Sequence, residues 1–230
     1  MPTLSQSESD EYKNGYNVST CEIRHGKVRI QVKEVKSPSE ALQHEFYCRA
    51  WFNVLRNGGK IFSIYYPDME PVGGPYGLFI PQNQPPSPYF AIVKQGDYDG
   101  RLFLVNKSGD VHNLKGGSYF VTRDKRYLFS EYVSDMSGLE VFDLRKGKTV
   151  FTSDEDFPEI LRWYENKGEY FFIELAPSKS EECEAYWIDF AKGQITKKRV
   201  NAAALSRARE VKFDFDAKLY ADCSCSDGRG

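Results

Sequence analysis

The chain has 230 residues, of which 40% are hydrophobic and 15% aromatic, so it can bury one sizeable core or two smaller ones. Its 31 basic and 33 acidic residues leave a formal net charge of −2, which argues against a nucleic-acid-binding protein with a broad positive surface. No stretch approaches the ~18 consecutive apolar residues of a membrane-spanning helix, so no membrane span is expected.

The ends of the chain differ from its middle. Residues 1–15 are polar and aperiodic, which predicts a disordered N-terminal tail without the apolar segment of a signal peptide. We therefore expect a cytoplasmic protein, or a periplasmic one if a signal peptide has been removed. Residues 16–220 are expected to form a single β-rich domain, divergent in 16–88 and repetitive in 89–200. Residues 221–230 are expected to be a flexible C-terminal tail.

The first strands are predicted from two periodic segments. Residues 21–35 alternate between apolar and charged side chains, as a half-buried strand does. Residues 44–66 contain two apolar runs separated by Asn57-Gly58, and an Asn-Gly step between apolar runs is a strong hairpin signal.

A proline-rich segment follows at 67–89. It contains seven of the eleven prolines and cannot form a continuous central strand. Long loops of this kind either bind partners or cover the edge of a sheet. Tyrosine combines apolar area with a polar hydroxyl, so the candidate binding residues are Tyr65, Tyr66, Tyr76 and Tyr89.

One short phrase then occurs three times, at 102–114, 139–151 and 185–198. Each copy is an apolar strand, an Asp or Asn, a polar step with Lys and Gly, and a second strand. The copies recur roughly every 40 residues, the size of one four-stranded propeller blade. Segments 119–132 and 160–175, which precede the second and third copies, each predict a further hairpin.

These patterns predict an all-β fold of consecutive antiparallel four-stranded meanders, which is propeller-like. At about 40–45 residues per blade, four or five blades fit, and the ring is either closed or incomplete and open. Tight hairpin turns need positive φ angles, and a short polar side chain before the turn can accept its backbone N–H groups. The predicted turn residues are Gly109, Gly147 and Gly193, preceded by Asn106, Asp143 and Asp189. A ligand role for the last three is the alternative.

The segment 120–150, FVTRDKRYLFSEYVSDMSGLEVFDLRKGKTV, resembles the blade consensus of the bacterial TolB-like and WD40-like β-propellers. The resemblance covers about residues 90–200 and implies a propeller fold without naming a function. Lys125 stands where that consensus usually has glycine, and no copy ends in Trp-Asp.

The C-terminal part carries the one predicted helix, at 201–210, within the basic stretch 197–212. A solvated helix face is the simpler interpretation, and a phosphate-binding patch is the alternative. Cys223 and Cys225 are expected to be free thiols, because a C-x-C pair without a second pair fits a zinc site poorly. No metal and no cofactor are predicted.

No nucleophile-elbow or phosphate-binding loop motif occurs in the sequence. We therefore expect a non-catalytic scaffold that binds an unknown protein or peptide. One alternative is a hydrolase or lyase with a carboxylate or metal site in the central cleft, built from residues such as Glu131, Glu174 and Asp189. Another is a structural protein that is completed by forming a homodimer.

Overall fold

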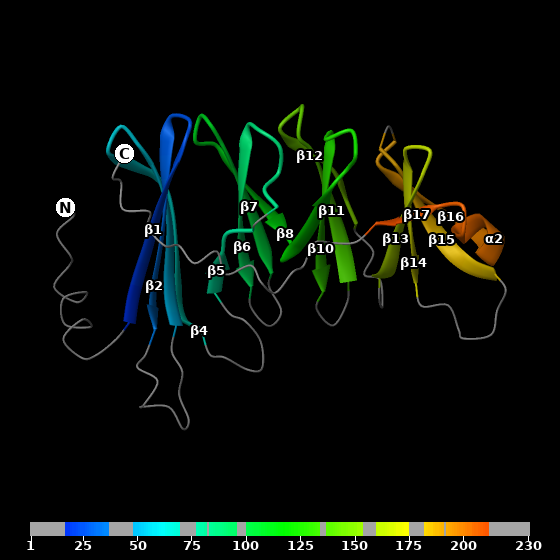
Figure 1. Cartoon of the computed structure of the whole chain (residues 1–230), viewed down its shortest axis with the longest axis horizontal. Coiled ribbons are helices and arrows are strands. Elements are labelled where there is room, and N and C mark those ends of the chain that lie inside the picture. The colour runs from blue at the N-terminus through cyan, green and yellow to red at the C-terminus, as the bar shows by residue number, and fades with distance from the viewer. Residues whose placement is uncertain are drawn as a thin grey trace, which may run out of the picture. The chain divides into compact units, whose positions relative to one another are not determined.

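The structure of the protein, a computed structural model, describes residues 17–36, 48–69, 77–81, 83–95, 100–133, 137–153, 160–174, 182–190 and 192–211. These residues form strands in four antiparallel sheets (Figure 1). No helix in this part of the chain is long and apolar enough to span a membrane.

The chain divides into two compact units. The described residues of unit 1 come from 17–95 and 103–113, and those of unit 2 from 100–102 and 114–211. The first sheet of unit 1 has the strands β1 (Asn17–His25), β2 (Val28–Lys36), β3 (Cys48–Arg56) and β4 (Gly59–Met69), in that order. The second sheet has β5 (Gly77–Phe79), β6 (Tyr89–Gln95), β7 (Arg101–Asn106) and β8 (Val111–Lys115).

Unit 2 repeats this plan with two further sheets. The first has the strands β9 (Ser118–Val121), β10 (Tyr127–Val133), β11 (Ser137–Asp143) and β12 (Lys148–Thr152). The second has β13 (Ile160–Asn166), β14 (Glu169–Glu174), β15 (Glu182–Asp189) and β16 (Gln194–Asn201), with β17 (Arg209–Val211) beside β13. The helix α2 (Ala202–Leu205) follows β16. The predicted all-β fold of consecutive four-stranded meanders is confirmed.

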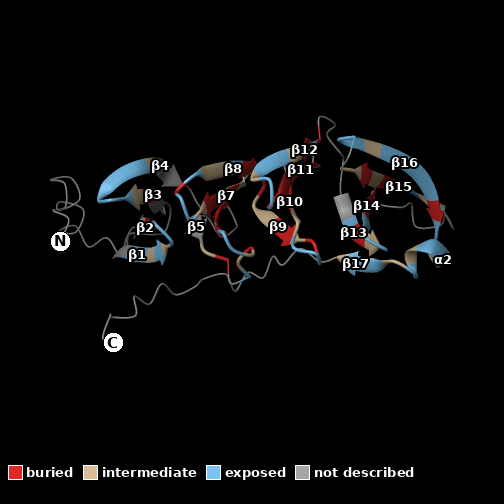
Figure 2. Cartoon of the chain, turned by 90° about the horizontal axis from the view of Figure 1, so that it is seen from above, coloured by how far each residue is buried: buried red, intermediate tan, exposed pale blue. Residues whose placement is uncertain are grey.

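The core of unit 1 follows from the alternation in its strands. Val28, Ile30 and Val32 of β2 are all buried, and they pack with Phe52 of β3 and Phe103 of β7. Residues between them on the strands face the other side of the sheet. The alternation predicted within 21–35 is therefore confirmed over residues 28–33, and Figure 2 colours the described residues by their burial.

The core of unit 2 is aromatic. Phe120 and Phe129 of the first sheet stack at a centroid distance of 4.5 Å, and Trp163 of the second sheet lies 5.4 Å from Phe129 in an edge-to-face arrangement. A buried aromatic side chain contributes about 1.5–3 kcal/mol through its area alone. On the other side of the second sheet, Tyr164 and Phe171 stack and pack near α2. Both faces of this sheet are therefore apolar.

The tight turns have the predicted left-handed backbone. Gly109, Gly147 and Gly193 have φ angles of 101°, 64° and 64°. The Asn57-Gly58 turn has positive φ at both residues, as a type I′ hairpin requires. Lys125, which replaces the consensus glycine, adopts a φ of 56° despite its side chain. The backbone of this turn is therefore the one that glycine would favour.

Two predictions need correction. The predicted helix 201–210 is limited to Ala202–Leu205, because Arg209–Val211 extends and pairs with β13 as a fifth strand. The predicted loop 67–89 contains the end of β4 and the short strand β5. Whether the two units act together as the single domain 16–220 stays a prediction. Both predicted tails lie outside the described residues.

Candidate functional site

The turn between β11 and β12 is organised by the carboxylate of Asp143, whose side chain is only 1% exposed. Its Oδ1 accepts hydrogen bonds from the backbone N–H groups of Arg145 at 2.9 Å and Lys146 at 3.0 Å. Arg126 Nε, from the neighbouring turn, lies 3.6 Å from Asp143 Oδ2. Asp143 therefore stabilises the turn, as predicted, and also fixes the guanidinium of Arg126.

The other two predicted turn residues act in the same way. Asp189 Oδ1 accepts a hydrogen bond from Lys192 N at 3.1 Å, and Asp189 O accepts one from Gly193 N at 2.8 Å. In unit 1, Asn106 Oδ1 accepts from the N–H groups of three residues within its turn. Unlike that of Asp143, the side chain of Asp189 is 36% exposed, and its Oδ2 lies 3.4 Å from Lys192 Nζ.

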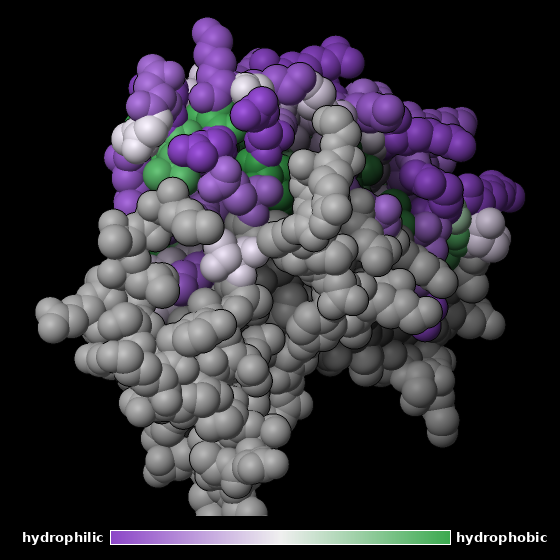
Figure 3. Space-filling view, turned by 60° about the vertical axis from the view of Figure 1, so that its left-hand side comes forward, coloured by the Kyte–Doolittle hydropathy of each residue, from purple (hydrophilic) through white to green (hydrophobic). Residues whose placement is uncertain are grey.

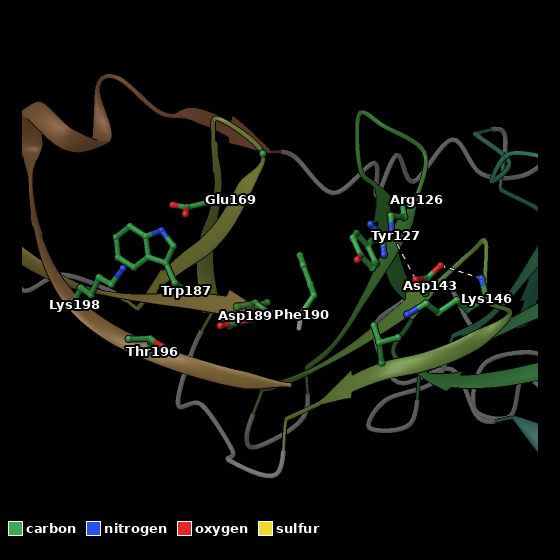
Figure 4. A pocket seen from close by; sticks show the side chains of 13 residues that line it. Arg126, Tyr127, Asp143, Lys146, Glu169, Trp187, Asp189, Phe190, Thr196 and Lys198 are labelled. Atoms are coloured by element: carbon green, nitrogen blue, oxygen red, sulfur yellow. Dashed lines mark hydrogen bonds and ion pairs between the residues drawn. The ribbon is translucent and has the colours of Figure 1, made fainter. Parts of the chain in front are cut away.

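A cavity of about 660 Å³ lies inside unit 2, next to these turns. Figure 4 shows side chains of the first sheet of the unit on one side of it and side chains of the second sheet on the other. The charged side chains that line it are Arg126, Lys146, Lys198, Asp143, Glu169 and Asp189. Three are cationic and three anionic, so the walls have both signs of charge and no net charge.

Aromatic rings form the remaining walls, and neighbouring groups hold them in place. Tyr127 and Phe190 stack at 4.3 Å, and the guanidinium of Arg126 lies 4.8 Å from the Tyr127 ring centroid. Trp187 stacks on Phe171, also at 4.3 Å. Burial raises the pKa of Tyr127 above its usual value of about 10, at which the hydroxyl is already neutral at pH 7, so Tyr127 can donate a hydrogen bond.

Lysines complete the cavity. The ammonium of Lys198 lies 4.9 Å from the Trp187 ring centroid, a cation–π contact. Lys146 is exposed at the β11–β12 turn, and Glu169 is exposed at the start of β14. Among the described residues, no group of three His, Cys, Asp or Glu side chains is placed to hold a metal ion.

Two of the three carboxylates named for a catalytic alternative have described side chains, and these two do not meet in this cavity. Asp189 lines it, but Glu131 does not. Glu131 lies four residues along β10 from Tyr127, which corresponds to about 13 Å. It is 9% exposed, its Oε1 has no hydrogen-bond partner among the described residues, and burial raises its pKa to about 7. The side chain of Glu174 lies outside the described residues.

The candidate binding tyrosines are placed differently from one another. Tyr65 is 47% exposed on β4 and stacks on Trp51 at 4.9 Å. Tyr89 is buried, with its ring centroid 6.0 Å from that of His112, so it does not present its ring to a partner. The side chain of Tyr66 and the whole of Tyr76 lie outside the described residues.

Most residues of the cavity were not candidates from the sequence. Lys146 and Phe190 lie in or next to repeated hairpin turns, whose composition predicts a turn and nothing more. Trp187 lies within a strand, where an aromatic residue is expected in the core. The only available signal was the recurrence of the turns, because hairpins in register place their turns at the same end of neighbouring sheets.

The cysteines contribute no described site. Cys183 is a free, half-buried thiol on β15, and burial raises its pKa. Cys223 and Cys225 lie outside the described residues.

Comparison with protein-family models gave no match, and comparison with the curated proteins gave none. Among solved structures, the chain is similar to the β-propeller domain of the Trilobed protease from Pyrococcus furiosus, whose topology is described as open velcro. The identity is 10% and the TM-score 0.39. The match covers 81% of this chain and 58% of the chain of the solved structure.

Proposed function

We propose that this chain is a non-catalytic binding scaffold of the TolB-like or WD40-like propeller kind, and that the cavity of unit 2 holds a segment of a partner protein or peptide. The observation that carries the proposal is the combination of fixed aromatic rings with exposed charges of both signs around one cavity.

The size of the cavity supports ligand binding. Ligand sites commonly have volumes of about 300–1,000 Å³, and this cavity falls within that range. Tryptophan, tyrosine and arginine supply most of the binding energy in protein interfaces. Here Trp187, Tyr127 and Arg126 are already held by stacking or ion-pair contacts, so binding would cost little side-chain entropy.

The carboxylates favour binding over catalysis. The carboxylate of Asp143 is engaged by two backbone N–H groups and a guanidinium, so it serves the turn between β11 and β12. Glu131, whose pKa of about 7 would suit a general acid or base, lies away from the cavity. The hydrolase or lyase alternative is therefore less well supported.

A selection with a displayed library of random peptides tests this proposal. We expect peptides selected on the wild-type protein to bind at least about tenfold more weakly to the Lys146→Glu variant, because the substitution reverses a charge at the cavity. Lys107→Glu, which reverses an exposed charge in a turn of unit 1, is the matched control. Selected peptides that bind both variants as well as the wild type would contradict a site in this cavity.

Homodimerisation is a second candidate, and the strand β4 favours it. β4 is the last strand of its sheet, and it carries the two large hydrophobic side chains that stand out as exposed among the described residues, Ile61 (41%) and Tyr65 (47%). In Figure 3 the molecule is turned so that the left-hand side of Figure 1 faces the viewer. Hydrophobic residues are visible there between hydrophilic ones. Exposed apolar edge strands tend to pair with other chains. A dimer by light scattering that Tyr65→Lys converts to a monomer would support this candidate, and a wild-type monomer would contradict it.

A further inference from the structure

The strand β16 forms an edge of its sheet. The strand order is β16-β15-β14-β13-β17, so β16 pairs with β15 on one side and with no strand of the described chain on the other. Most of its eight residues are exposed, and Figure 2 shows this exposure along the strand. Every second residue of such an edge directs its backbone N–H and C=O groups outward, where an added strand could pair with them.

The side chains of β16 give this edge a positive charge. Lys197, Lys198 and Arg199 are consecutive and exposed. Lys197 pairs with Glu184 at 2.5 Å, which neutralises part of the charge. Lys198 contacts the Trp187 ring, and no carboxylate of the described residues forms an ion pair with it, so its charge remains. The net charge of these side chains, with Glu184 included, is positive.

This charge selects the kind of chain that can pair with β16. A second copy of β16 would bring the same three cationic residues against one another, and like charges on facing strands are destabilising. Lysines on edge strands protect proteins from such self-pairing. An extended segment rich in aspartate or glutamate would instead gain from the same charges.

The edge is continuous with the cavity of unit 2. Thr196 and Lys198, which alternate on one face of β16, both line that cavity (Figure 4). Lys197 and Arg199 lie on the opposite face of the strand. A strand added at this edge would therefore direct every second side chain toward the cavity, where Trp187 and Phe190 offer apolar surface.

We infer that β16 is a docking edge for an acidic, extended polypeptide segment of a partner protein, which adds as a further strand to the sheet β13–β17 and places a side chain in the adjacent cavity. This inference rests on the proposed function, because it names the chemistry of the segment that the cavity holds. Backbone pairing supplies affinity in this mode of recognition, and the alternate side chains supply specificity.

The test uses a synthetic, fluorescently labelled peptide of about twelve residues with the repeat Glu-Glu-Val-Val, which places glutamates on both faces of a strand. Its binding to the whole protein is measured by fluorescence anisotropy. We expect saturable binding that weakens as salt is added, and at least about tenfold weaker binding when lysine replaces the glutamates. A peptide with the same charge but prolines at two central positions cannot pair along a strand, and it should bind at least about tenfold more weakly.

Variants locate the site. Lys198→Glu and Arg199→Glu should each weaken binding about tenfold or more, whereas Lys60→Glu, a charge reversal on the edge strand β4 of unit 1, should leave it unchanged. These residues are exposed, so the variants are expected to fold. Far-UV circular dichroism, matched between the variants and the wild type, checks that they do.

Each outcome supports or overturns the inference. Equal binding of the proline peptide would show attraction by charge alone and would overturn strand addition. Binding that survives both β16 variants would place the peptide elsewhere and would also overturn it. If the acidic peptides fail while peptides selected from the random library still depend on Lys146, the docking edge is wrong but the scaffold function stands. If both kinds of peptide fail, both proposals are wrong.

Discussion

The buried carboxyl of Glu131 predicts a pH-dependent stability that one substitution should remove. Burial raises its pKa from 4.5 to about 7, because the charged form loses hydration and its Oε1 has no hydrogen-bond partner among the described residues. A group whose folded-state pKa is raised contributes stability that is fully present below its unfolded pKa and is lost as the pH rises through the folded pKa. The loss should therefore develop between about pH 4.5 and pH 7.

The magnitude follows from the difference between the two pKa values. At 1.36 kcal/mol per pKa unit, the difference between 4.5 and about 7 lowers the free energy of unfolding by about 3 kcal/mol at pH 8. Glutamine has the shape of the protonated glutamate and cannot ionise. Glu131→Gln should therefore be more stable than the wild type by about 3 kcal/mol at pH 8 and nearly equal to it at pH 4.5.

Urea denaturation at the two pH values measures this difference. Trp163 and Trp187 lie in unit 2 and Trp51 in unit 1, so the comparison is made in a Trp51→Phe background, where the fluorescence follows the unit that contains Glu131. Glu210→Gln, which removes a carboxylate from an exposed position in the same unit, is the control and should show little change at either pH. Equal stability of Glu131→Gln and the wild type at pH 8 would refute a buried, unpartnered carboxylate.

Three further predictions concern turns and close contacts. Lys125→Gly should stabilise unit 2 by about 0.5–1 kcal/mol in thermal denaturation, because φ is 56° there, and a loss of stability would contradict a left-handed turn. Gly116→Ala should lower the free energy of unfolding, measured by urea denaturation, by about 2–3 kcal/mol more than Gly168→Ala does. The Cβ added at Gly116 would lie 2.6 Å from the carbonyl carbon of Glu131, whereas a Cβ added at Gly168 would have nothing within 4 Å. Equal costs would argue against that close approach. Asp143→Ala should cost about 2 kcal/mol, since it removes the acceptor of two backbone N–H groups beside Arg126, and a cost near zero in the same assay would show that the turn does not depend on this carboxylate.

The repeated hairpins were predictable because their signals are local. A turn with an Asp or Asn before it and a glycine within it depends on the φ angles of a few neighbouring residues, and the structure has those angles at Gly147 and Gly193. Alternation along β2 likewise depends only on the period of a strand. The meanders follow from joining such hairpins in chain order.

The short helix was overestimated because a long-range contact competes with local propensity. The sequence 201–210 favours a helix, but Arg209 lies opposite Glu165 of β13, and the two side chains form a hydrogen-bonded ion pair. A partner about 44 residues away in the sequence leaves no local signal. Helix formation therefore stops at Leu205, and the chain returns to the sheet.

The candidate site could not be predicted from the sequence, because it too depends on long-range contacts that leave no local signal. Its walls come from strands of two sheets, so their proximity depends on how the sheets pack and not on any linear motif. Composition pointed to four tyrosines, Tyr65, Tyr66, Tyr76 and Tyr89. The burial of Tyr89 depends on contacts that its own neighbours in sequence do not reveal.

Hydrogen exchange measured by mass spectrometry tests the binding site most directly. The protein is compared with and without a saturating concentration of a peptide selected from the random library. A binding site in the cavity predicts slower exchange in β16 and in the turns at 122–126, 144–147 and 190–193, with no change in β1 to β4. Slower exchange confined to unit 1, or none in unit 2, would contradict it.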